Sequence, residues 1–183
     1  MTNKEFAMTN KEFAIRAKEI ATNYNTVWVF NTYGKPLRFF DLSKPIYGSN
    51  PEAIKNAPPD AFTFDCWGLV TAILWGFNGD LNHENGGSVD NGIPRLTYHT
   101  AEELSKTFSD DFSEPIMVGE LLWKPKTNSL GIYIGDNQVV VSTPRGDGSV
   151  QIITINDDGS YDMSPNRWQK HGKHPAIKYE ESL

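Results

Sequence analysis

The order of two kinds of pattern along the chain limits the possible fold more than any other feature of the sequence. Helical spacing of apolar residues dominates as far as residue 108, and short runs rich in β-forming residues follow. These runs cover residues 121–123, 130–134, 138–142 and 151–155. The Gly-Asp-Asn and Arg-Gly-Asp-Gly segments between them tolerate the positive φ angles of tight turns. Helices first and an antiparallel meander after predict an α+β domain, in which a helix packs on one face of the sheet.

Three helices are predicted. From Thr9, apolar residues recur among charged ones in the pattern of an amphipathic helix that ends near Asn23. Residues 66–77 place apolar side chains on one helical face, and Asp65 stands where an N-cap is expected. A shorter helix is expected over residues 100–108, which open with a capping box.

The chain is predicted to form a single domain over residues 15–180, because no linker or shift in composition divides it. Residues 1–7 and 8–14 carry the same seven letters, MTNKEFA, which we interpret as a duplicated start or a cloning scar. Residues 27–30 indicate a short strand. Residues 31–59 are rich in Gly, Pro and Asn and are expected to form a long ordered loop.

Charge and hydropathy exclude several classes of partner. The formal net charge is −6, from 17 basic and 23 acidic residues, and no basic stripe stands out, so nucleic acid is not expected as a partner. The longest apolar run, residues 69–77, is too short for a bilayer span of about 20 residues. The N-terminus lacks the apolar segment of a signal peptide, so the chain is expected to be cytoplasmic as synthesised.

Cys66 is the single cysteine, which excludes an internal disulfide and a cysteine-rich metal site. It would lie in the first turn of the helix over residues 66–77, where the helix dipole and free amide groups favour a thiolate and lower the pKa of the thiol. That placement suits a nucleophile. The alternative is a buried structural cysteine, since free cysteine is among the most buried residue types.

Several motifs, in order along the chain, indicate what kind of site Cys66 belongs to. Residues 64–70, Phe-Asp-Cys-Trp-Gly-Leu-Val, resemble the Asp-Cys-x-Gly-Leu-Val signature of the NlpC family. Further blocks similar to that family, in its phage endolysin and prophage lysin branch, lie at residues 73–80, 91–94, 118–123, 131–136 and 167–173. The resemblance spans roughly residues 15–179. It implies a papain-like fold and a cysteine hydrolase that cuts amide bonds in bacterial peptidoglycan, reaching the wall after holin-type release.

The same resemblance indicates a degenerate catalytic triad. The family places its histidine two residues before the Gly-Ile-Tyr-Ile-Gly block, where this chain has Ser129, and its third residue about a dozen positions later, where this chain has Val141. Serine is no base at neutral pH, and valine cannot orient an imidazole. His83, in the loop after the cysteine helix, is an alternative source of an imidazole.

Two classes of function remain open. The first is a weak or inactive peptidoglycan amide hydrolase with Cys66 as nucleophile. The second is a non-catalytic pseudoenzyme that binds peptidoglycan fragments or a protein partner in the same groove. Tyr33, Asp65 and Trp67 are expected to line that groove, Tyr33 by its match to a family position near the cleft and Trp67 by its place beside the cysteine. No metal and no cofactor are expected.

Overall fold

The computed structural model describes residues 8–89, 104–156 and 167–180, and it confirms the predicted α+β class. Its larger sheet has five strands in the order β8-β7-β6-β5-β9, all paired antiparallel. The strands are β5 (Leu121–Lys124), β6 (Ser129–Gly135), β7 (Gln138–Ser142), β8 (Val150–Thr154) and β9 (Lys170–Gly172). The first four confirm the predicted meander. The fifth, β9, was not predicted as a strand.

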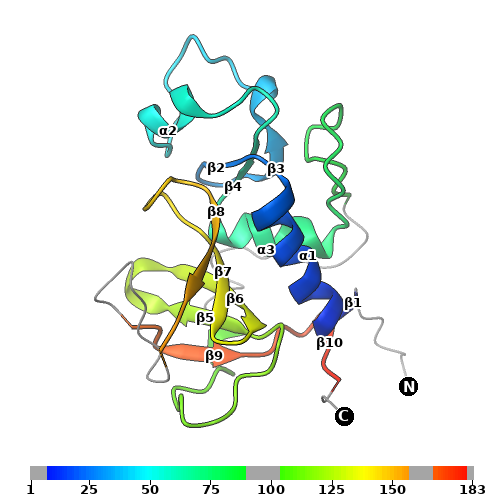
Figure 1. Cartoon of the computed structure of the whole chain (residues 1–183), viewed down its shortest axis with the longest axis vertical. Helices are drawn as coiled ribbons and strands as arrows, with labels where there is room; N and C mark the ends of the chain where they lie inside the picture. The colour runs from blue at the N-terminus through cyan, green and yellow to red at the C-terminus, as the bar shows by residue number, and fades with distance from the viewer. Residues whose placement is uncertain (1–7, 90–103, 157–166, 181–183) are drawn as a thin grey trace.

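Two helices cover one face of this sheet (Figure 1). Helix α1 (Asn10–Asn23) packs on β6, β7 and β8, and α3 (Cys66–Leu74) packs on β6 and β7. The start of α1 is set by a capping box, in which the Thr9 hydroxyl and the Glu12 carboxylate each accept the other residue's backbone N–H. The main core lies between the helices and the sheet, and a smaller apolar cluster covers the sheet's other face.

A second, three-stranded sheet leads into the cysteine helix. Its strands β2 (Thr26–Trp28), β4 (Phe62–Phe64) and β3 (Tyr33–Pro36) lie in the order β2-β4-β3, with β2 and β4 parallel. The expectation of a plain loop over residues 31–59 is therefore wrong, because the segment holds β3, the 3-10 helix η1 (Leu37–Phe39) and α2 (Pro51–Asn56). These elements are too short for a periodicity to show in the sequence.

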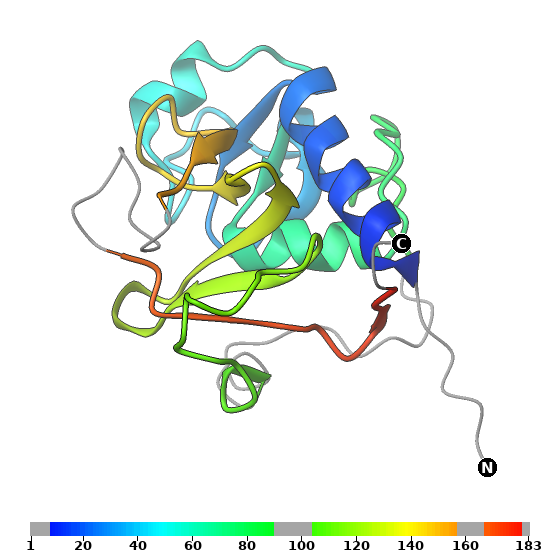
Figure 2. The same ribbon diagram turned by 60° about the horizontal axis from the view of Figure 1, so that its bottom comes forward.

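The two ends of the described chain meet (Figure 2). Strand β1 (Met8–Thr9) pairs in parallel with β10 (Ile177–Lys178), and the Asn10 side chain donates to the Val118 carbonyl at 2.9 Å. Residues 8–14 thus form β1 and the first turn of α1, so the predicted boundary at residue 15 falls inside a helix. Residues 100–103 of the helix predicted over residues 100–108 lie outside the described residues, and residues 104 and 105 are helical. No helix in the described ranges is long and apolar enough to cross a membrane.

Candidate functional site

The junction between β4 and α3 holds Cys66 at a helix start, as predicted. Asp65 is the N-cap, and its carboxylate accepts the backbone N–H of Gly68 and that of Asn31, each at 2.6 Å. A Cβ atom at residue 68 would lie 1.7 Å from the Thr32 carbonyl oxygen, so only glycine allows the loop to approach the helix this closely. This tight junction fixes the direction in which the Cys66 side chain leaves the helix.

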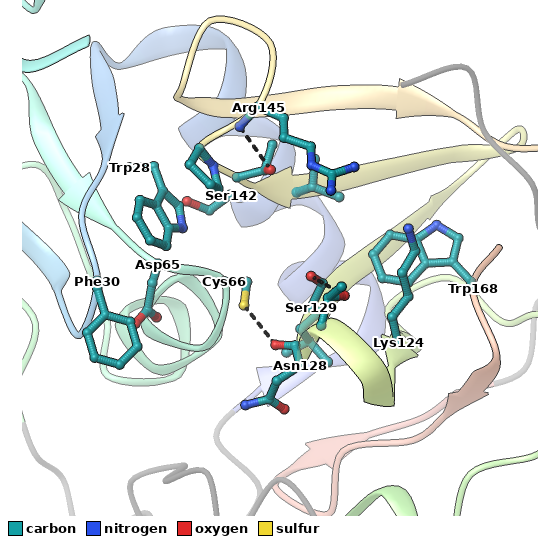
Figure 3. A pocket seen from close by; sticks show the side chains of 15 residues that line it. Trp28, Phe30, Asp65, Cys66, Lys124, Asn128, Ser129, Ser142, Arg145 and Trp168 are labelled. Atoms are coloured by element: carbon teal, nitrogen blue, oxygen red, sulfur yellow. Dashed lines mark hydrogen bonds between the residues drawn. The ribbon is translucent and has the colours of Figure 1, made fainter. Parts of the chain in front are cut away.

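Cys66 faces a cavity of about 480 Å³ between the cysteine helix and the end of the larger sheet. Ser129 (Figure 3) and Val141, the two positions at which triad residues are predicted to be missing, line the same cavity. Gly131 is the register partner of Val141, so Ser129 and Val141 are diagonal neighbours on one face of the β6–β7 pair. The structure therefore brings the three residues together from three separate elements.

The immediate partners of Cys66 are not those of an activated thiol. Its Sγ lies 3.6 Å from the carbonyl oxygen of Asn128, which can only accept the S–H. The Ser129 hydroxyl forms a hydrogen bond of 2.9 Å with the Thr127 hydroxyl, and Val141 is a buried apolar residue of β7. None of these groups takes a proton from the thiol near neutral pH.

The pKa of the Cys66 thiol is raised from its ordinary value of 9.0 to about 12. Burial is the first cause, because it disfavours the charged thiolate, and the negative charge of neighbouring Asp65 is the second. The predicted net lowering of this pKa is therefore wrong. Backbone N–H groups at the helix start, those of Cys66 and Trp67, do lower the pKa, but by less than burial and the charge of Asp65 raise it.

No histidine in the described ranges lines the cavity. His83, the alternative source of an imidazole, accepts the backbone N–H of Asn85 in the loop after α3. His171 is buried on β9 and contacts Glu120 at 2.7 Å, and His174 accepts the backbone N–H of Ala176. His99 lies outside the described residues. Nor does any group of three His, Cys, Asp or Glu side chains in the described ranges gather as metal ligands do.

The three predicted groove residues have different surroundings. Asp65 lines the Cys66 cavity, as expected. Trp67 does not, because it lies one helical position round from Cys66 and packs into the main core with 5% of its surface exposed. Tyr33 lines a neighbouring hollow, where its ring packs edge-on against Trp75 at 5.7 Å. Phe30 lines both hollows and so stands between them.

No pattern in the sequence predicts two cations in this cavity. Lys124, at the end of β5, is only 5% exposed, and its ammonium lies 5.0 Å from the centre of the Trp168 ring. Burial and the nearby charge of Arg145 lower the pKa of Lys124 from 10.5 to about 8. Arg145 and Trp168 come from the loop after β7 and the segment before β9, which no local pattern relates to Lys124. Strand pairing alone brings them to one place.

Comparisons with known proteins give limited similarity. The chain matches no protein-family model and no curated protein. Among solved structures, it is similar to NlpC2 from Trichomonas vaginalis, with a TM-score of 0.41 and 16% identity over 87% of this chain. This chain spans 47% of that protein's length. It is also similar to the P60 domain of an antigen from M. avium subspecies paratuberculosis, with a TM-score of 0.45, 15% identity, and 93% and 98% of the two chains covered.

Proposed function

We propose that this chain is an NlpC-type domain that binds peptidoglycan peptides in the Cys66 cavity and no longer hydrolyses them efficiently. The ordered sequence motifs support the NlpC type and its phage-lysin branch, in which such a domain reaches the wall after holin-type release. One observation is the main support for the loss of hydrolysis. The thiol faces Ser129, Val141 and a carbonyl oxygen in a cavity with no imidazole among the described residues.

The electrostatics of the site support the same conclusion. With a thiol pKa of about 12, on the order of one molecule in 10⁵ carries a thiolate at pH 7. A cysteine hydrolase needs both the thiolate and a proton donor for the leaving group. The cavity is lined by aromatic, apolar and charged groups, which is the composition of a ligand site.

Binding is tested by sedimentation with purified insoluble peptidoglycan. We expect the wild type to sediment with the wall material. Ser129→Trp, which fills the cavity from its partly exposed wall, should stay in the supernatant. Lys126→Trp is the matched control, because residue 126 is exposed, lies three positions away and does not line the cavity. Equal sedimentation of both variants would show that the wall binds elsewhere or not at all.

Weak hydrolysis is the second candidate, favoured by the intact placement of Cys66 at a capped helix start that faces the cavity. Turbidity clearance of wall suspensions tests it. The wild type should not clear them, whereas Ser129→His combined with Val141→Glu should restore clearance, because the pair supplies a base and the group that orients it. Each single change should restore less, and Cys66→Ala in the double variant should abolish the effect. Strong clearance by the wild type would overturn the loss of hydrolysis.

A further inference from the structure

The cavity around Cys66 has two chemically different ends (Figure 3). Asp65, Trp28 and Phe30 lie on one side of the cysteine, and Lys124 and Arg145 gather on the other side with Trp168. Asp65 is the acidic residue among the described cavity lining, and both of its carboxylate oxygens accept backbone N–H groups. Its charge thus interacts with backbone N–H groups around the start of α3. We call the other part of the cavity, with Lys124, Arg145 and Trp168, the cationic end.

Lys124 is held at this end by the fold. It closes β5 directly opposite Ser129 on β6, so both side chains project from the same face of the sheet into the cavity. The methylene stem is buried, and the ammonium lies over the face of Trp168. Two residues further on, Lys126 is exposed. A lysine at that nearby position keeps its hydration, whereas Lys124 is held in the cavity at a cost in desolvation.

Arg145 adds a second positive charge. It is exposed on the β7–β8 connection, and its backbone is fixed by two hydrogen bonds. Its N–H donates to the Thr143 hydroxyl, and its carbonyl accepts from the Gln151 amide. Its charge is close enough to disfavour the protonated form of Lys124. Both cations line the same cavity, so an anion bound between them would be attracted by both.

The geometry points to an anion subsite, formed by Lys124 and Arg145, that takes a carboxylate of the ligand bound in the Cys66 cavity. The aromatic ring of Trp168 and the apolar Leu130 and Val141 beside it fit the organic group that carries the carboxylate. The subsite rests on the proposed function only for the identity of that ligand, a peptide derived from the wall. A guanidinium and an ammonium on one carboxylate give charge-assisted hydrogen bonds, which are the stronger kind.

Calorimetric titration with a matched pair of peptides tests the subsite. One is a tetrapeptide of the wall stem with a free C-terminal carboxylate, and the other is the same peptide with a C-terminal carboxamide. We expect the carboxylate peptide to bind wild type about 10-fold or more tightly than the amide, in line with a hydrogen bond to a charged group. Arg145→Gln and Lys124→Met should each remove most of that preference. Lys126→Gln, which changes net charge equally outside the cavity, should retain it.

A second titration separates failure of the subsite from failure of the proposed function. Phenylacetate and phenylacetamide are titrated while tryptophan fluorescence is followed, because Trp28 and Trp168 line the cavity. If neither peptide binds, the proposed ligand is wrong, and a preference for phenylacetate that Arg145→Gln removes would still support the subsite. Equal binding of acid and amide in both pairs would overturn it, as would a preference that survives Arg145→Gln. Arg145 is exposed, so its replacement leaves the fold intact and tests the subsite independently of Lys124→Met.

Discussion

Alkylation of Cys66 by iodoacetamide measures how far the fold suppresses this thiol. At pH 8 a thiol with the ordinary pKa of 9.0 is about one tenth thiolate, whereas one with a pKa of about 12 is thiolate in about one molecule in 10⁴. The reactive fraction therefore falls by about 10³. A more basic thiolate is the better nucleophile, and over three pKa units this recovers about 20-fold. The native protein should react about 50-fold more slowly than an ordinary thiol.

The same chain in concentrated urea supplies the reference rate, since unfolding removes both the burial and the fixed neighbour Asp65. The logarithm of the native rate should climb with pH to at least pH 10 without levelling. Asp65→Asn removes the adjacent negative charge while keeping an N-cap side chain, and it should react faster than wild type. An inflection below about pH 8 in the native wild type would refute the reasoning, because it would reveal a group that stabilises the thiolate.

Three further predictions concern the frame around the site. Gly68→Ala should lower the free energy of unfolding by about 3 kcal/mol or more in urea titrations, because its Cβ would strike the Thr32 carbonyl, and an unchanged midpoint would contradict this. The hydrogen bond to Glu120 raises the pKa of His171, so the stability it contributes is full below pH 6.5 and is lost as pH rises through the raised value. In His171→Gln, the free energy of unfolding should depend less on pH over this range. Lys124→Met should gain about 1 kcal/mol at pH 7 by removing a buried charge. This advantage over wild type should shrink between pH 8 and 10.5, where Lys124 is more protonated in the unfolded chain than in the folded one.

Local patterns in the sequence were sufficient for the elements that carry the site. The start of α1 directly after Thr9, the start of α3 at Cys66 and the cap at Asp65 follow from side chains within four residues of each helix end. The four strands of the meander follow from runs of β-forming residues between turns that tolerate positive φ. These features depend on near neighbours in the chain, which a sequence displays directly.

The tertiary structure alone decided what the site is chemically. The sequence predicts an acidified thiol at a helix start, but burial and the charge of Asp65 reverse the direction of the pKa shift. Trp67 follows the cysteine in the chain and yet points into the core. The cationic end joins Lys124 to Arg145, 21 positions apart, through the pairing of β5 with β6 and of β6 with β7. Desolvation and charge contacts depend on which distant segments meet, and strand pairing sets those meetings only once the chain has folded.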